Sequence, residues 1–235
     1  MQTKQIDLVI FDCDGVLIDS EIISSKILIS QLSAAGVSVD FDYFQRWFLG
    51  RSFPKVAESV RQTFDVILPA DFETSYRRRL LKAFGTELKA TDGVAEILGN
   101  LSRPTCVATS STPERVRKSL ELTGLAHYFG RDVFTASEVE NGKPAPDLFF
   151  HTADKMNVDP EKCLVIEDSL PGMEAGVAAG MLVWRFTGAS HLQGLAQKDH
   201  DMFPDVPVFD NWSKFFEMAP ALKQQKHSIG DISVR

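Results

Sequence analysis

The sequence lacks the features that define several classes of protein. It has three cysteines in 235 residues, an odd number without the spacing of a metal site or a disulfide framework. No apolar run reaches the roughly 18 residues that a membrane span requires, and the first ten residues carry no apolar stretch like that of a signal peptide. We therefore expect reduced cysteines, no membrane partner and a cytoplasmic location.

Basic residues are too few for a surface that binds nucleic acid. Lys and Arg number 25 and Asp and Glu number 32, which gives a formal net charge of −7. This excess of acid disfavours binding to a phosphate backbone, so we predict no nucleic-acid partner. The 44% hydrophobic and 24% charged residues are ordinary for a globular chain with a sizeable core.

Short apolar segments alternate with helical patterns along most of the chain. Strands are expected at 6–11, 105–109, 133–135, 164–166, 182–186 and 206–209, and helices at 113–123, 147–156 and 170–179. This alternation predicts an α/β fold in which helices cover both faces of a parallel sheet.

One long segment interrupts this alternation. Residues 19–87 contain helical patterns at 22–35, 42–48, 55–64 and 72–84, without a strand pattern between them. They predict a helical subdomain inserted after the first strand. We expect residues 1–18 and 88–212 to form the core domain, 19–87 the helical cap, and 213–235 a C-terminal helix and tail.

Two acids follow the first predicted strand, in Asp12-Cys13-Asp14-Gly15. Residues two apart on a strand project to the same side, so both carboxylates are expected together at the carboxyl edge of the sheet. A buried pair would raise one pKa or recruit a cation. A solvated turn is the alternative interpretation.

Hydroxyl groups and a lysine mark two further strand ends or loops. Residues 109–112 are Thr-Ser-Ser-Thr directly before a predicted helix, where unpaired N–H groups favour an anion. Plain helix capping is the alternative. Lys143 lies between Gly142 and Pro144, in a loop that two prolines stiffen, and could supply a positive charge to a phosphate.

A second pair of acids, Glu167 and Asp168, follows the apolar strand at 164–166. Carboxylate oxygens suit a hard cation such as Mg²⁺, although acids at a helix start are also common. The carboxyl ends of parallel strands meet at one edge of a sheet. Together the four motifs therefore predict a site for a metal-bound phosphate.

At these residues the sequence resembles the haloacid dehalogenase superfamily, in its phosphatase and phosphomutase branch with a helical cap. The resemblance extends from residue 11 to about 180 in the order of the family. It implies a Rossmann-like core with an inserted helical cap. It is carried by Phe11-Asp12-Cys13-Asp14-Gly15-Val16-Leu17-Ile18-Asp19-Ser20-Glu21, Thr109-Ser110, Gly142-Lys143-Pro144-Ala145-Pro146-Asp147, and Glu167-Asp168-Ser169 with Gly172, Ala175 and Gly176.

The resemblance also implies a role for each matching residue. Asp12 would attack phosphorus and form an aspartyl phosphate, and Asp14 would protonate the leaving oxygen and then help to activate water. Thr109 and Lys143 would hold the phosphoryl oxygens. Because an ordinary Asp is ionised at pH 7, Asp14 would need a shielded position to act as an acid. The implied ligands of Mg²⁺ are Asp12, the backbone carbonyl of Asp14, Asp168 and, directly or through water, Glu167.

Substrate recognition is expected from Ser110 and from the cap residues Gly50 and Arg51. Arg77-Arg78-Arg79 is interpreted mainly as a solvated helix face. No histidine has the spacing of a zinc site, and none is placed in the predicted active site; the five are His127, His151, His191, His200 and His227.

The leading hypothesis is a Mg²⁺-dependent phosphatase for a small phosphorylated metabolite, either a sugar phosphate or a sugar-acid phosphate, in a monomer or weak homo-oligomer. A sugar phosphomutase of the β-phosphoglucomutase type is the alternative. Those relatives have a histidine in the first cap helix where this sequence has Ser24. Dehalogenases lack the acid two residues after the nucleophile, and Asp14 is present here. A non-catalytic receiver-like module is shorter and has no helical cap.

Overall fold

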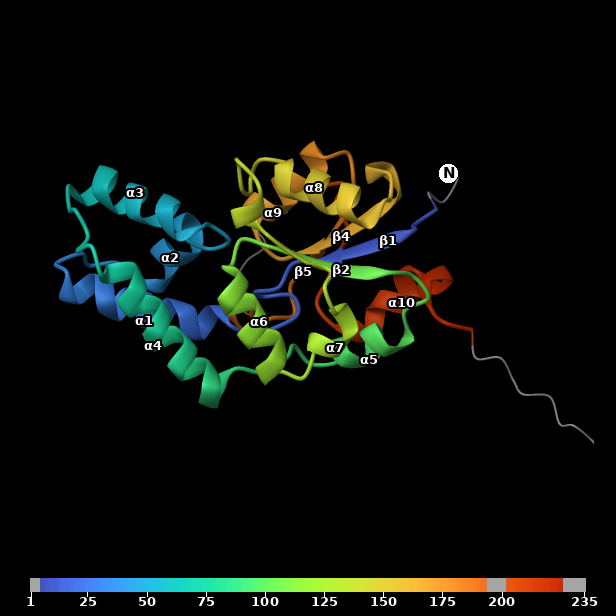
Figure 1. Cartoon of the computed structure of the whole chain (residues 1–235), viewed down its shortest axis with the longest axis horizontal. Helices are drawn as coiled ribbons and strands as arrows, with labels where there is room; N and C mark the ends of the chain where they lie inside the picture. The colour runs from blue at the N-terminus through green and yellow to red at the C-terminus, as the bar shows by residue number, and fades with distance from the viewer. Residues whose placement is uncertain (1–4, 194–201, 226–235) are drawn as a thin grey trace, which may run out of the picture.

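Six parallel strands form the sheet of this computed structural model, which describes residues 5–193 and 202–225 (Figure 1). The strands are β1 (Leu8–Phe11), β2 (Thr105–Thr109), β3 (Val133–Thr135), β4 (Cys163–Glu167), β5 (Leu182–Phe186) and β6 (Val208–Phe209). Their order in the sheet is β3-β2-β1-β4-β5-β6, and every pairing is parallel. The predicted α/β fold with a parallel sheet is confirmed.

The two faces of the sheet carry separate hydrophobic layers. Along β1, Val9 and Phe11 face one layer while Leu8 and Ile10 face the other, as the alternation of side chains on a strand requires. The first layer is covered by α5 (Val94–Asn100), α6 (Pro113–Leu122), α7 (Ala126–Phe129) and α10 (Phe215–Met218), and the second by α8 (Asp147–Met156) and α9 (Leu170–Ala178) (Figure 1). Because both faces are covered, β1 is apolar throughout and the residues before the last one in β4 are apolar as well.

Four of the five helices between β1 and β2 share a hydrophobic core of their own. They are α1 (Glu21–Ala34), α2 (Phe41–Trp47), α3 (Phe53–Phe64) and α4 (Phe72–Glu87), and we call residues 21–87 the helical segment. Their buried side chains include Leu32, Phe44, Val60 and Phe84. The helical segment extends away from one end of the sheet (Figure 1). These helices therefore pack around a cluster of their own, while the division of the chain into a core domain and a cap at 19–87 stays a prediction.

The structure refines several sequence-based boundaries. Helix α5 was not expected, and β6 is limited to two residues of the expected 206–209. Trp212, Phe215 and Leu222 are buried in the layer that contains Val9, so the segment after residue 212 packs against the sheet. The end of the predicted tail, 226–235, lies outside the described residues, as do His200 and His227.

Two further expectations concern the cysteines and the membrane. Cys13, Cys106 and Cys163 are all free and buried, as expected for reduced thiols in a protein core. Within residues 5–193 and 202–225, no helix combines the length and the apolar character needed to cross a bilayer.

Candidate active site

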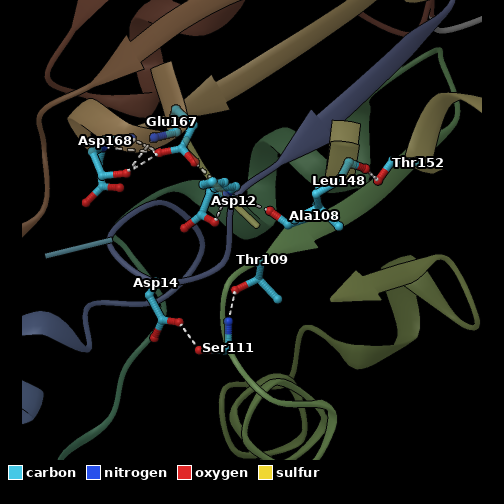
Figure 2. Close-up of polar contacts among 12 residues, drawn as sticks. Asp12, Asp14, Ala108, Thr109, Ser111, Leu148, Thr152, Glu167 and Asp168 are labelled. Carbon is cyan, nitrogen blue, oxygen red and sulfur yellow. Dashed lines mark hydrogen bonds and ion pairs between the residues drawn. The ribbon is translucent and has the colours of Figure 1, made fainter. Parts of the chain in front are cut away.

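The site lies where the strand order reverses. From β1 the chain continues to β2 and β3 on one side of the sheet, and then returns to β4 on the other side of β1. Ligands of open α/β sheets bind outside the carboxyl ends of the strands at such a point. Asp12 directly follows β1, and Glu167 and Asp168 stand at the end of β4 (Figure 2).

Lys143 joins the two strand ends. Its Nζ donates hydrogen bonds to Asp12 Oδ1 at 2.6 Å, to Glu167 Oε1 at 2.6 Å and to the Ala108 carbonyl at 2.9 Å. Only 1% of the Lys143 side chain is exposed. Burial alone would lower the pKa of Lys143, but the carboxylates of Asp12 and Glu167 outweigh it and raise the pKa above its ordinary value. Lys143 is therefore a fixed positive charge.

Glu167 is held by the protein at both of its oxygens. While Oε1 accepts from Lys143, Oε2 accepts from the backbone N–H groups of Asp168 at 3.0 Å and Ser169 at 3.1 Å, and from the Ser169 hydroxyl at 3.0 Å. A Cβ at residue 172 would lie 1.8 Å from Glu167 Oε1. Only glycine at this position, near the start of α9, leaves space for the Glu167 carboxylate. Glu167 thus fixes Lys143 and the start of α9.

Three carboxylates form a group that fits a metal ion. One oxygen each from Asp12, Glu167 and Asp168 lies within 4.8 Å of the others, and all three residues are buried. Lys143 balances one of the three charges, which leaves two for a divalent cation. Burial raises the pKa of Asp12 despite Lys143, and burial together with the Glu167 charge raises that of Asp168. Buried Asp168 Oδ2 has no hydrogen-bond partner among the described residues, so this hard oxygen set fits Mg²⁺.

Asp14 lines the same pocket as Asp12, and its charge adds to the raised pKa of Asp12. Strand β1 ends at Phe11, so its alternation does not extend to residue 14, and Figure 2 shows Asp14 turned towards Ser111. The Asp14 carboxylate accepts from Ser20 Oγ at 2.6 Å, Ser111 Oγ at 2.5 Å and Arg115 Nη2 at 2.6 Å. Burial would raise the pKa of Asp14, but Arg115 and the two hydroxyls outweigh it and lower the pKa. Asp14 is held ionised, not in the protonated form expected of an acid.

The hydroxyl loop after β2 lies beside the acids. Thr109 is buried, and its Oγ1 accepts a hydrogen bond from the Ser111 N–H at 3.0 Å, while Ser110 lines the pocket described below. Thr112, at the start of α6, makes no side-chain capping bond; its Oγ1 instead accepts from Arg77 Nη1 at 2.9 Å. The plain capping interpretation of this loop is therefore not supported.

A pocket of about 90 Å³ lies between these residues and the helical segment. The strand ends and loops at the carboxyl edge of the sheet contribute Asp12, Asp14, Thr109, Ser110, Lys143 and Asp168. The helical segment contributes Gly50, Arg51 and Arg77 among others. Gly50 has a φ of 70°, and a Cβ there would lie 2.6 Å from Ser169 Oγ, so glycine permits this close approach. All the predicted site residues except Glu167 line this pocket, and Glu167 is buried in contact with Lys143.

Three residues near the site were missed or misread from the sequence. Arg115 binds Asp14, and Arg77 lines the pocket instead of belonging only to a solvated helix face. His191, which was placed in no site, is buried with its Nε2 3.1 Å from Asp168 Oδ2. Burial lowers the pKa of the His191 imidazole, so the ring is neutral at pH 7. Arg77 and His191 reach the site from segments distant from the predicted motifs, whereas Arg115 lies in α6, three residues after the hydroxyl loop. No short motif marks Arg115 or His191.

Glu21 at the start of α1 makes the stability depend on pH. Burial raises its pKa to about 8, and the Asp14 charge adds to the increase while Arg115 opposes it. Between the ordinary value of 4.5 and about 8, the folded protein keeps a proton that the unfolded chain has lost. The free energy of unfolding contributed by Glu21 is therefore largest below pH 4.5 and declines as the pH rises to about 8.

We expect Glu21→Gln to stabilise the fold increasingly towards high pH, because glutamine needs no proton to be neutral. Relative to wild type, the gain should be small near pH 5 and on the order of a few kcal/mol near pH 9. Urea unfolding at several pH values measures it. Glu96→Gln, at an exposed position on α5, is the matched control. A gain for Glu21→Gln that does not change with pH would contradict this explanation.

Comparison with known proteins places the chain in a family. A family model for haloacid dehalogenase-like hydrolases matches residues 6–180. The 6-phosphogluconate phosphatase of Escherichia coli is 30% identical over 216 residues, 92% of this chain and 95% of that protein. The fructose-1-phosphate phosphatase of the same organism is 32% identical over 178 residues, 73% of this chain and 92% of that protein.

A solved structure supports the same relationship. The haloacid dehalogenase-like protein of unknown function from Agrobacterium tumefaciens superposes with a TM-score of 0.78 at 31% identity, covering 92% of this chain and 98% of that one. The chain therefore belongs to the haloacid dehalogenase-like hydrolases. The predicted family and the predicted enzyme class, phosphoric monoester hydrolase, are confirmed.

Proposed function

We propose that this protein is a Mg²⁺-dependent phosphatase that releases phosphate from a small sugar phosphate or sugar-acid phosphate through an aspartyl phosphate on Asp12. The observation that carries the proposal is the buried contact of Asp12 Oδ1 with Lys143 Nζ at 2.6 Å, beside acids that fit a metal ion. A nucleophilic carboxylate, a fixed positive charge and a metal site are the groups that phosphoryl transfer needs. Relatives with phosphorylated sugars in their names support this substrate class.

Asp12 and Lys143 carry the first step. Lys143 occupies Asp12 Oδ1, so we assign the attack on phosphorus to Oδ2. Lys143 and Thr109 stabilise the charge of the phosphoryl oxygens, and both are held rigidly before the substrate arrives. Asp12, Asp168 and Glu167 would hold Mg²⁺, which would supply further positive charge to the phosphoryl group and orient it.

Asp14 carries the proton transfers. In the arrangement described here its ionised carboxylate is bound by Arg115, and this is the form that activates water against the aspartyl phosphate. Donating a proton to the leaving oxygen requires the protonated form, so Asp14 has to move away from Arg115 when substrate enters. The pocket between the sheet and the helical segment provides the shielded space for that change.

We assign the helical segment the role of a cap that covers the pocket and selects the substrate. Arg51 and Gly50 lie in the loop between α2 and α3 that reaches the pocket. Among the described residues, four hydrogen bonds join the segment to the core beside the site: Gln45 to the His191 carbonyl, Lys55 to the Lys143 carbonyl, Arg77 to Thr112, and Arg115 to Ser24. Their lengths of 2.8, 3.1, 2.9 and 3.2 Å support a cap that closes over the pocket and shields the reaction from water.

Hydrolysis is favoured over a mutase reaction by the environment of Ser24. A mutase has to protect its aspartyl phosphate from water and uses cap contacts to align its acid. Ser24 is buried, and its Oγ accepts from Arg115 Nη2 at 3.2 Å, so it contributes no group that titrates near neutral pH.

Phosphate release from a panel of phosphorylated sugars and sugar acids tests the proposal. The panel includes 6-phosphogluconate and fructose 1-phosphate, measured with Mg²⁺ and after complete metal removal with EDTA. We expect turnover of at least one compound that is lost in EDTA and restored by Mg²⁺. A separate reaction contains β-glucose 1-phosphate and a trace of glucose 1,6-bisphosphate, and it measures the formation of glucose 6-phosphate. If glucose 6-phosphate forms far faster than phosphate is released, or if full activity remains without metal, the proposal is overturned.

A further inference from the structure

We propose that His191, in the short helix η3 (Ser190–Leu192) after β5, is a positioning residue that orients the metal ligand Asp168. This inference rests on the proposed function, because it concerns the Mg²⁺ that the function requires. The His191 side chain is 0% exposed, and its Nε2 lies 3.1 Å from Asp168 Oδ2.

The contact joins two buried side chains, and the atoms that meet have no hydrogen-bond partner in the part of the chain that the structure describes. Neither ring nitrogen of His191 has a hydrogen-bond partner among the described residues, and neither has Asp168 Oδ2. The two atoms are within hydrogen-bond distance, but their alignment does not make a hydrogen bond in this arrangement. Buried polar groups left in this state are uncommon and call for an explanation. A modest turn of the Asp168 carboxylate as it binds a cation would align the pair and satisfy both.

The backbone confines Asp168 between two neighbours. Gly15 has a φ of 80°, and a Cβ there would lie 2.0 Å from Asp168 Oδ2 and 3.0 Å from His191 Cε1. The loop that follows Asp12 therefore packs directly on the Asp168 carboxylate, with the imidazole beside it. His191 lies within hydrogen-bond distance of this oxygen and can give it a donor, since an imidazole ring carries at least one N–H. Such partners of a ligand fix its orientation at a metal site.

His191 is better placed to support the ligand than to bind the metal itself. It does not belong to the group of oxygens from Asp12, Glu167 and Asp168 that lie within 4.8 Å of one another. Mg²⁺ also prefers oxygen ligands to imidazole nitrogen.

The loop that carries His191 is anchored on both sides. Gln45 Nε2 on α2 donates to the His191 carbonyl at 2.8 Å. The neighbouring Ser190 donates to Asp19 Oδ1 from its hydroxyl at 2.7 Å and from its backbone N–H at 3.2 Å. These contacts hold the imidazole in place before a metal ion arrives, which is the preorganisation that a positioning residue requires.

The test compares metal binding by His191→Leu and His191→Gln in the absence of substrate. Binding of Mn²⁺ to the full chain is measured by electron paramagnetic resonance, and Mg²⁺ affinity by competition. We expect His191→Leu to weaken binding about 10- to 100-fold, while His191→Gln, which keeps an N–H donor, recovers much of the loss. His151→Leu on α8, whose ring contacts Glu138 at 3.3 Å, is the control and should bind like wild type.

Unfolding measured without metal separates positioning from a purely structural role. His191→Leu removes two buried unpaired nitrogens, so it should unfold at the same or a higher urea concentration than wild type, although it binds metal more weakly. Each of three results would overturn the inference: unchanged Mn²⁺ affinity in His191→Leu, equal affinities in the Leu and Gln variants, or a wild type that binds no metal.

Failure of the proposed function would look different. Wild type would then release phosphate from no compound of the panel, while His191→Leu would still bind Mn²⁺ more weakly than wild type.

Discussion

Replacing Asp12 with asparagine should abolish phosphate release, with a loss on the order of 10⁴-fold or more, because a side-chain amide lacks the nucleophilic carboxylate that forms the acyl phosphate. The fold should survive, since Lys143 keeps its contact with Glu167 and its bond to the Ala108 carbonyl. Activity is measured on the best substrate of the panel. Intact-mass analysis of acid-quenched protein measures phosphoenzyme, which should be present in wild type and absent from Asp12→Asn.

Asp14→Asn is the matched control for this prediction. It changes the second acid of the same loop but leaves Asp12 and Lys143 paired. This variant should still form phosphoenzyme while losing the proton-transfer contribution, typically about 10²- to 10⁴-fold. Phosphoenzyme in Asp12→Asn would show that another residue is the nucleophile.

Lys143→Met should reduce both stability and activity. Methionine keeps the length of the side chain but leaves the buried carboxylates of Asp12 and Glu167 without their counter-charge. Removing one partner of a buried ion pair typically costs about 3–5 kcal/mol in the free energy of unfolding. Urea unfolding in EDTA measures this cost, and phosphate release measures the loss of charge stabilisation at the phosphoryl group.

A double variant separates the two effects of Lys143. In Lys143→Met with Glu167→Gln, one of the uncompensated charges is gone, so much of the stability should return while activity stays lost. Lys155→Met, at an exposed position on α8, should change the free energy of unfolding by less than about 0.5 kcal/mol. Wild-type activity in Lys143→Met would exclude Lys143 from the reaction, and wild-type stability would show that the buried carboxylates had been protonated.

The sheet and the acids at its edge could be predicted because each is a local pattern. An apolar run that ends in acids, as before Asp12 and Glu167, identifies both a buried strand and the edge at which it stops. The parallel arrangement then requires these ends to meet. Lys143 could be included because the residues around it resemble those of the family, and the structure brings it to both acids.

The environment of Asp14 could not be predicted in the same way. Arg115, which binds Asp14, lies 101 residues further along the chain, and its position depends on how α6 packs beside the first loop. His191 reaches Asp168 from a loop after β5, and only the register of β4 and β5 brings them together. An arginine in a helix and a histidine in a loop carry no signal of such contacts. Strand alternation does not account for the position of Asp14, because β1 ends at Phe11.

The separation of the site residues along the chain has a consequence for folding. Lys143 lies 131 residues after Asp12, and the pairing of β1 with β4 joins residues 8–11 to residues 163–166. By contrast, the core of the helical segment is formed within residues 23–84. Contacts between distant residues form late, because closing a long loop costs entropy before any contact repays it. During synthesis or refolding, recovery of phosphatase activity would therefore report the pairing of β1 with β4 and not the earlier formation of helices.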